Sequence, residues 1–233
     1  MKRFINRSAA GRELAQRLAH YRDQPDVLVL GLPRGGVPVA FEVARFLHAP
    51  LDVMVVRKLG APEQPEFAIG AIASGGVTLI NESIPAWYKD SVDIERIAAA
   101  ERIELERRER AFRGGHSPLI ANDRTVLLVD DGAATGATMR AAVRAARSLN
   151  AKKVVVALPV ASVDAYELLR DEADEVVCLA APLGFYAVGQ WYEEFTQTTD
   201  EEVTDLLARA NSLAARGQRP ASLRQAARAS RTK

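Results

Sequence analysis

The sequence predicts an α/β protein built on a doubly wound, mainly parallel sheet. The first observation is a series of short apolar runs that end at turn signals, at residues 27–30, 51–56, 126–129, 152–158 and 175–179. Continuous apolar runs of this length are typical of strands buried on both faces of a parallel sheet. The second observation is that helical patterns separate most of these runs, as in a doubly wound fold. Ligands of such folds bind outside the carboxyl ends of the strands.

Helical patterns and one hairpin complete the predicted elements. Residues 7–21 form the first helical pattern, in which Leu14 and Leu18 share a stripe. Further helices are expected over residues 40–47, 91–112, 139–149, 163–170 and 200–209. Residues 67–73 and 77–80 are predicted as two strands joined by Ser74, Gly75 and Gly76, which form a hairpin signal.

The longest helix, residues 91–112, pairs many Glu and Arg side chains at i, i+3 and i+4 spacing, which favours an exposed surface. Its apolar residues form a narrow stripe for packing on the domain or on a second copy in a homo-oligomer; they are Ile94, Ile97, Ile103 and Leu105. We expect one domain over residues 1–210, with an insert at 81–123 and a small hood at 181–198. Residues 211–233, rich in Ala, Arg and Ser, are expected to be a flexible basic tail.

The composition excludes several classes of protein. The formal charge of +1 gives no case for a polyanionic partner, and the alternating signs of residues 91–112 argue against a nucleic-acid-binding face. No apolar segment approaches the length of a membrane span, and the charged N-terminus lacks the apolar core of a signal peptide. Cys178, the single cysteine, lies in an apolar run and is expected to be buried rather than reactive. These features favour a cytoplasmic protein.

The stretch TVLLVDDGAATGAT, residues 125–138, places Asp130 and Asp131 directly after a buried strand. The turn at residues 135–138 leads into a helix, whose first N–H groups and positive dipole suit a phosphate. Carboxylates about one sugar away can accept hydrogen bonds from vicinal hydroxyls or hold a divalent cation. The stretch therefore indicates a ribose phosphate ligand. The alternative is a Rossmann-like strand with an acidic loop; a Walker A loop is excluded, because no Gly-Lys-Ser/Thr follows a glycine-rich turn.

A second strand, loop and helix junction carries Arg34, Gly35 and Gly36. The two glycines allow backbone angles closed to other residues and let an oxyanion approach the N–H groups, and Arg34 adds a planar charge. The alternative is a tight turn with a solvated arginine. Arg57 and Lys58 follow the run at 51–56 and are expected in a mobile charged loop; the alternative for them is an exposed charge pair.

Residues 125–138 resemble the motif that binds phosphoribosyl pyrophosphate (PRPP) in type I phosphoribosyltransferases: an apolar strand, two acids, a short gap and Thr-Gly-x-Thr. The resemblance covers nearly all of residues 3–207. It implies that Asp130 and Asp131 hold the ribose hydroxyls. It implies a pyrophosphate loop at Arg34, Gly35 and Gly36, which Arg57 and Lys58 face. The residues implied for the 5′-phosphate are Ala133, Ala134, Thr135, Gly136, Ala137 and Thr138.

The resemblance also assigns the outer segments. The hairpin is expected to belong to a flexible loop that closes over the site, with Glu66 at the substrate. The hood is expected to bind a base on its aromatic side chains, the alternative being a small lid packed on the sheet; these side chains are Phe185, Tyr186, Trp191 and Tyr192. Ala134 departs from hypoxanthine/guanine-type members, which carry an acid there. The chain as a whole resembles predicted phosphoribosyltransferases of unassigned acceptor.

The implied function is Mg²⁺-assisted transfer of a 5-phosphoribosyl group from PRPP to a nitrogenous base, with release of pyrophosphate. Catalysis is assigned to Arg34, Lys58, Asp130 and Asp131. The two aspartates are also the candidate Mg²⁺ ligands, beside oxygens of PRPP and water. The alternative is a non-catalytic regulator that binds PRPP or a nucleotide. The basic residues Arg34, Arg57 and Lys58 disfavour this alternative, since a regulator has no leaving group to stabilise. A phosphate-ester hydrolase is disfavoured, because the sequence lacks a Ser/His/Asp or multi-histidine set.

Overall fold

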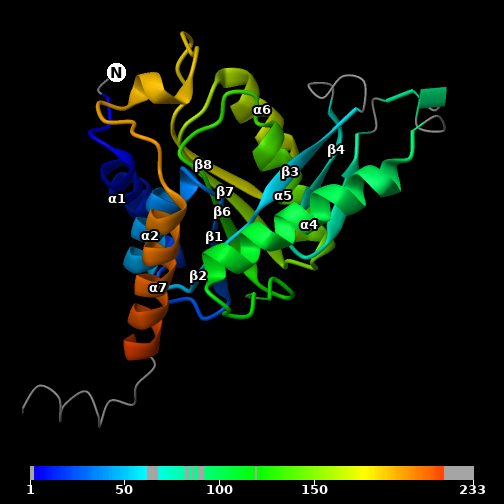
Figure 1. The fold of residues 1–233 in the computed structure, drawn as a ribbon. Helices are drawn as coiled ribbons and strands as arrows, with labels where there is room; N and C mark the ends of the chain where they lie inside the picture. The colour runs from blue at the N-terminus through cyan, green and yellow to red at the C-terminus, as the bar shows by residue number, and fades with distance from the viewer. Residues whose placement is uncertain are drawn as a thin grey trace, which may run out of the picture.

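Five parallel strands form the central sheet of the computed structural model, which describes residues 3–61, 68–81, 84–85, 87–88, 92–118 and 120–217 (Figure 1). Their order across the sheet is β2-β1-β6-β7-β8, and each neighbouring pair is parallel. The strands are β1 (Val27–Gly31), β2 (Leu51–Val53), β6 (Thr125–Val129), β7 (Lys153–Val160) and β8 (Glu175–Ala180). The predicted fold class is confirmed. Glu66 and residues 218–233 lie outside the described residues, so their predictions remain open.

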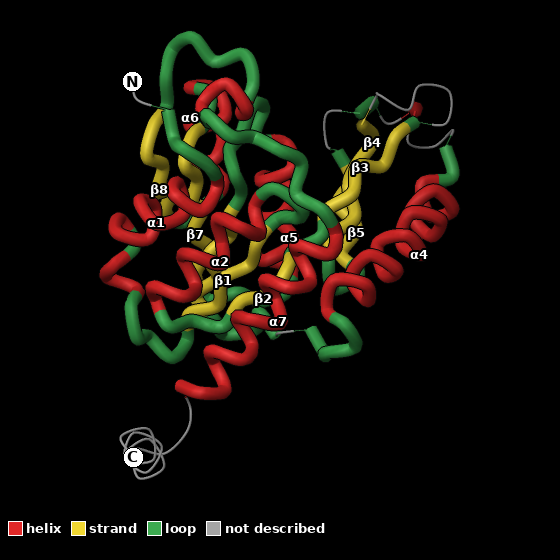
Figure 2. Tube along the Cα trace, turned by 60° about the vertical axis from the view of Figure 1, so that its left-hand side comes forward, coloured by secondary structure: helices red, strands yellow, loops and turns green. Residues whose placement is uncertain are grey.

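Helices cover both faces of this sheet (Figures 1 and 2). One face is covered by α1 (Arg7–Arg17), α2 (Gly36–Leu47) and α7 (Asp200–Gly217). The other face is covered by α5 (Ala137–Ser148) and α6 (Val163–Glu172). Two large clusters of buried side chains follow from this arrangement, one on each face of the sheet. Short 3₁₀ helices occur at Ala19–Tyr21 (η1) and Val188–Trp191 (η2).

Several helix boundaries differ from the prediction, and the first and last helices differ as follows. The first helix stops at Arg17, and η1 replaces its predicted last turn. Helix α7 runs to Gly217, eight residues past the predicted end at 209, so residues 211–217 of the predicted tail are helical. Its apolar side chains Val203, Leu206 and Leu207 are buried and anchor the start of this helix in the core.

A second, antiparallel sheet of three strands stands apart from the first: β3 (Val56–Gly60), β4 (Ala68–Ala73) and β5 (Val77–Ile80). It lies between α5 and α4 (Ile94–Arg113), and both helices contact it. The predicted hairpin is confirmed, and its turn holds Gly75 at φ 81° and Gly76 at φ 76°. The predicted single strand at 51–56 was wrong. The backbone N–H of Val55 donates to Ser74 Oγ, so the chain has already moved to the second sheet there.

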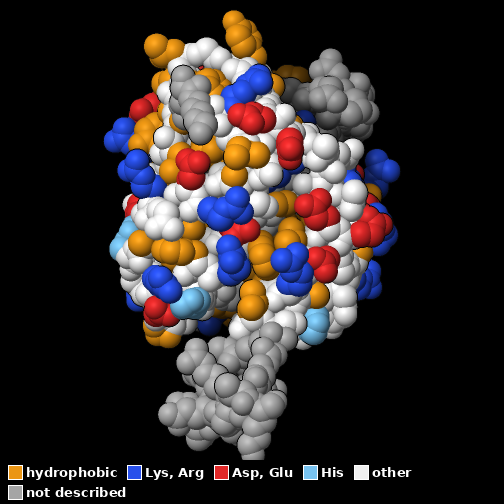
Figure 3. Space-filling view, turned by 90° about the vertical axis from the view of Figure 1, so that its left-hand side faces the viewer, with side chains coloured by type: hydrophobic (Ala, Val, Ile, Leu, Met, Phe, Trp, Pro, Cys, Tyr) orange, Lys and Arg blue, Asp and Glu red, His pale blue; other side chains and the backbone are white. Residues whose placement is uncertain are grey.

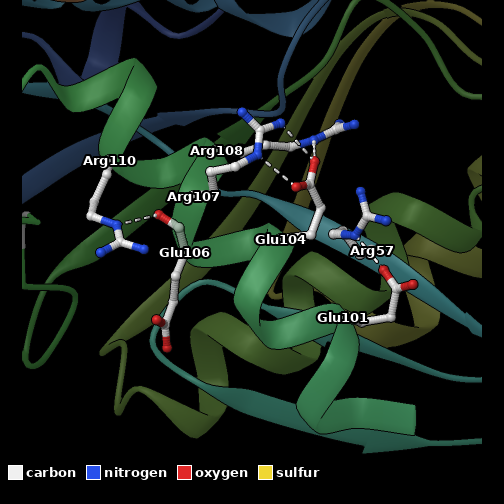
Figure 4. Close-up of polar contacts among 7 residues, drawn as sticks. All are labelled: Arg57, Glu101, Glu104, Glu106, Arg107, Arg108 and Arg110. Carbon is white, nitrogen blue, oxygen red and sulfur yellow. Dashed lines mark hydrogen bonds and ion pairs between the residues drawn. The ribbon is translucent and has the colours of Figure 1, made fainter.

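Helix α4 packs by a heptad-spaced seam of Ala98, Leu105 and Phe112, all buried. The predicted stripe was wrong at Ile103, which is 69% exposed. The predicted ion pairing is confirmed on the exposed side: Glu104 binds both Arg107 and Arg108 (Figure 4). Hydrogen bonds from these two arginines lower the pKa of Glu104 to about 2.

The surface and the cysteine agree with the composition. On the face formed by α1, α2 and α7, basic and acidic side chains are interspersed and neither sign dominates (Figure 3). Cys178 is partly buried against the core cluster under α5 and α6, and its Sγ lies 3.1 Å from the carbonyl oxygen of Ala180. Burial raises the pKa of this thiol to about 11. Across the described ranges, every helix is too short or too polar to cross a bilayer.

Candidate active site

The two predicted anion loops lie side by side at the carboxyl end of the sheet. Strands β1 and β6 pair in register from Val27 to Gly31, and the N–H of Leu32 donates to the carbonyl oxygen of Val129 at 2.9 Å. The chain after each strand therefore leaves the sheet at the same point. This brings together the loop at residues 32–36 and the acid pair at 130–131, as the sequence predicted.

The glycines of the first loop are required by close packing. A Cβ on Gly35 would stand 2.1 Å from Asp131 Oδ2, and a Cβ on Gly36 would stand 2.6 Å from the carbonyl oxygen of Val129. The sequence interpretation, that these glycines supply unusual backbone angles, was wrong at Gly35: its φ of −61° and ψ of −30° are ordinary helical values. Absence of a side chain lets the acid pair lie directly against the loop.

Helix α2 begins in this loop, four residues earlier than predicted, with Gly35 as its N-cap. The N–H of Gly36 donates to the carbonyl oxygen of Leu32, and the N–H of Val37 donates to that of Arg34. Within the described ranges, the backbone N–H groups of Arg34 and Gly35 have no acceptor. These two donors, at the positive end of α2, are the ones that an anion can use. The peptide bond between Pro33 and Arg34 is cis.

Asp131 is held from three sides. Its Oδ2 accepts a hydrogen bond from Arg7 Nε at 2.7 Å, and the two side chains are 13% and 12% exposed. Its carbonyl oxygen accepts a hydrogen bond from the Tyr192 hydroxyl at 2.5 Å. Its backbone N–H donates to Asp130 Oδ1 at 2.8 Å. The carboxylate is thus held by Arg7 of α1, and the backbone of Asp131 is held by the hood and by Asp130.

Burial is the main influence on the protonation of the acid pair. It raises the pKa of Asp130 well above the usual range, and the neighbouring charge of Asp131 adds to the effect. Burial also raises the pKa of Asp131, while the hydrogen bond and charge of Arg7 oppose that rise. Two adjacent carboxylates in a poorly solvated place favour cations and hydroxyl donors as ligands.

The predicted phosphate turn starts α5. Gly136 takes the left-handed conformation at φ 73°, and the helix begins at Ala137, two residues earlier than predicted. The turn is tied to the end of β7, because Ser162 Oγ donates to the carbonyl oxygen of Ala134 at 2.6 Å and Ala133 bridges to Ala161. The exposed members of the turn are Ala134, Thr135, Ala137 and Thr138.

The predicted cations divide between two places. Arg57 and Lys58 lie in strand β3, so their assignment to a loop was wrong. As neighbours in a strand they point to opposite sides. Lys58 and Thr138 line the same cavity of about 180 Å³ between the second sheet and α5. Arg57 points toward α4 and pairs with Glu101 at 2.5 Å (Figure 4). Arg34 is partly exposed, 3.6 Å from Asp200 at the start of α7.

The hood has one buried half and one more exposed half, and base binding there stays a prediction. Tyr192 is buried and packs on Phe4 and Phe195, with ring centroids 5.6 and 5.1 Å apart. This half is a lid fixed to the N-terminal segment. Phe185 stacks on Trp191 at 6.3 Å, and Tyr186 is 91% exposed. In that half, Phe185 and Trp191 are partly buried and Tyr186 leaves its ring exposed.

Two side-chain groups that contact Asp131 escaped the sequence reasoning: the guanidinium of Arg7 and the hydroxyl of Tyr192. Both act on Asp131 from segments far away in the chain. The sequence signal near Arg7 was Asn6, whose side chain caps α1 by accepting from the N–H of Ala9. It fixes where the helix begins, but nothing in it identifies the partner of Arg7.

The donor set suits a hard cation only in part. The described ranges hold no group of three or more His, Cys, Asp or Glu residues able to ligate a metal. Oxygen donors are present in Asp130 and Asp131, which is the chemistry that Mg²⁺ prefers. Since Asp131 is already paired with Arg7, a cation here would draw most of its ligands from a bound phosphate compound and water.

Comparisons with known proteins identify the family of this chain. The model of a family described as "Phosphoribosyl transferase domain" matches residues 5–189. Two curated relatives from Mycobacterium tuberculosis strains CDC 1551 and H37Rv, provisionally named phosphoribosyl transferases, are each 51% identical over 212 residues. The match covers 91% of this chain and 48% of each relative, so the chain spans about half their length. The crystal structure of TT1426 from Thermus thermophilus superposes with a TM-score of 0.77 at 44% identity, covering 89% of this chain and 98% of that one. The family model covers far more than half of the chain, which therefore belongs to the phosphoribosyl transferase domain family.

Proposed function

We propose that this chain transfers the 5-phosphoribosyl group of PRPP to a nitrogenous base and releases pyrophosphate. The observation that carries the proposal is the packing of the acid pair against the glycine loop. A Cβ at Gly35 has no room beside Asp131, so the residue proposed to bind the ribose is adjacent to the loop proposed to bind the pyrophosphate. The phosphate turn at the start of α5 lies on the same edge of the sheet. Membership of the family supports the general activity.

Each part of PRPP has a place in this proposal. The 5′-phosphate binds at residues 135–138, where the start of α5 supplies N–H groups and two threonine hydroxyls. The pyrophosphate binds the backbone N–H groups of Arg34 and Gly35, with the Arg34 guanidinium beside it. Lys58 approaches from the second sheet and shares a cavity with Thr138. We assign no direct contact to Arg57, because it is engaged with Glu101.

The chemistry follows from these positions. The bond between C1 of the ribose and the pyrophosphate oxygen breaks, and its electron pair leaves with the pyrophosphate. The lone pair of the base nitrogen forms the new bond to C1, and that nitrogen loses its proton to water. Positive charge develops on the sugar ring, as at other glycosidic carbons, and the negative carboxylates of Asp130 and Asp131 stabilise that charge. Binding at the 5′-phosphate, remote from the reacting bond, orients the ribose.

Mg²⁺ is part of the proposal as a cation beside the pyrophosphate. Bound there, it would neutralise charge that gathers on the leaving group. Asp130 would hold it, directly or through water, while Asp131 stays with Arg7. The chain's own residues perform the remaining steps: they bind the two phosphate ends, hold the hydroxyls and keep the ring in place.

A regulator that binds PRPP without turnover is the competing function, and turnover separates the two. The protein is incubated with PRPP, Mg²⁺ and a panel of purine and pyrimidine bases, and pyrophosphate release is followed. We expect release with at least one base, and its loss in Asp131→Asn. Tight PRPP binding without release for any base would favour the regulator. If the protein neither binds PRPP nor releases pyrophosphate, the proposed function is contradicted.

A further inference from the structure

Arg7 occupies a place between three separate parts of the molecule. Its Nε donates to Asp131 Oδ2 at 2.7 Å, and one terminal nitrogen donates to the carbonyl oxygen of Thr196 at 2.6 Å. Its guanidinium carbon lies 3.9 Å from the ring centroid of Phe195. The side chain is 12% exposed. One arginine at the start of α1 therefore links the acid pair to the end of the hood.

We propose that Arg7 is a positioning residue, which fixes the Asp131 carboxylate for the ribose hydroxyls and ties that carboxylate to the hood. The inference rests on the proposed function and deepens it. It assigns Arg7 an action through Asp131, and no contact with PRPP.

The packing around Asp131 explains why a positioning group is needed. Asp131 Oδ2 lies so close to Gly35 that no room remains for a methyl group between them. A Cβ at Gly35 would also be 3.3 Å from Arg7 Nε, so carboxylate, guanidinium and loop backbone meet at one point. Without Arg7, a buried carboxylate would lose its charged partner, which is strongly unfavourable. The carboxylate would then turn away from its present position, which removes an acceptor for the ribose.

The contacts of Arg7 with the hood give the link a second consequence. A planar guanidinium stacked on an aromatic ring and bonded to a carbonyl oxygen has little freedom to rotate. Movement of residues 195–196 must therefore move Arg7, and through it Asp131. A change in the hood that does not touch the PRPP site should still alter PRPP binding.

A double-mutant cycle tests the proposal, because it separates action through Asp131 from direct contact with PRPP. PRPP affinity is measured by calorimetry in Mg²⁺ buffer for the wild type, Arg7→Met, Asp131→Asn and the double variant. Arg17→Gln, an exposed arginine on the same helix, is the matched control. Loss of a charged hydrogen bond predicts roughly a tenfold or greater weakening in Arg7→Met. In the Asp131→Asn background the same change should add less than about twofold.

Several outcomes would overturn the inference. Unchanged PRPP affinity in Arg7→Met would overturn it. So would a double variant whose loss of binding free energy equals the sum of the losses in Arg7→Met and Asp131→Asn, since additive losses indicate a direct contact of Arg7 with PRPP. If the wild type does not bind PRPP, the proposed function fails together with the inference; if the wild type binds and only the cycle disagrees, the proposed function stands.

Two further variants keep the test open if Arg7→Met does not fold, as judged by circular dichroism. Arg7→Lys keeps the charge but loses the planar fork, and it should show an intermediate loss in the same cycle. Phe195→Leu removes the ring beneath the guanidinium at a site 38% exposed, and circular dichroism checks that it folds. It should weaken PRPP binding as well, and wild-type affinity in both variants would overturn the inference.

Discussion

Replacing Gly35 with alanine tests the packing on which the site depends. The added Cβ would stand 2.1 Å from Asp131 Oδ2 and 2.8 Å from Asp131 Cγ, where real Cβ atoms keep at least 3.0 Å. The carboxylate or the loop must therefore move by about 0.9 Å, and a movement of the carboxylate away from Arg7 would lengthen their 2.7 Å bond beyond hydrogen-bond distance.

The magnitude follows from two opposing effects. Overpacking of a filled site costs about 1–3 kcal/mol. The helical φ and ψ of Gly35 suit alanine. Alanine lowers the conformational entropy of the unfolded chain, which stabilises the folded protein by about 0.4–1 kcal/mol. We expect a net loss of about 1–2 kcal/mol, which corresponds to a fall in Tm of roughly 2–8 °C for a chain of this size.

Urea unfolding followed by circular dichroism measures the difference. Gly184→Ala is the matched control, because a Cβ at Gly184 meets nothing within 4 Å. The control should stay within about 0.5 kcal/mol of the wild type. If Gly35→Ala is as stable as Gly184→Ala, the carboxylate does not lie against the loop and the reasoning is refuted.

Two further predictions concern the phosphate turn and the cysteine. Gly136→Val should weaken PRPP binding and cost about 1–2 kcal/mol of stability, because a β-branched residue resists the φ of 73° found there. Gly136→Asn, which tolerates that conformation, should retain more affinity, and equal effects of the two would contradict the assignment. With its pKa at about 11, Cys178 should react with iodoacetamide at pH 8 at least ~100-fold more slowly in the folded protein than in urea. Mass spectrometry follows the alkylation, and similar rates in both states would show that the thiol is not protected.

The sheet was predictable because its signals are local. The apolar runs that became β1, β6 and β7 are buried on both faces, and each ends at a turn that its own residues specify. The run at 51–56 failed for a physical reason. It is equally apolar throughout, but Met54 still bonds to Gly31 while Val55 bonds to Ser74, and periodicity does not reveal a change of sheet.

The candidate site was predictable where it follows strand ends and unpredictable where it depends on distant contacts. Asp130, Asp131 and the glycine loop meet because parallel strands bring their carboxyl ends to one edge. Arg7 and Asp131 are 124 positions apart, and an arginine at a helix start has many possible partners. The opposite directions of Arg57 and Lys58 became apparent only when both were found in one strand.

The central claim is that PRPP lies across the acid pair with a phosphate pocket at each end. A crystal structure of the protein with PRPP and Mg²⁺ tests it most directly. We predict the 5′-phosphate at residues 135–138, the ribose hydroxyls at Asp130 and Asp131, and the pyrophosphate at Arg34 and Gly35. PRPP bound at any other part of the molecule, or with its two phosphate ends exchanged between the pockets, would contradict the account.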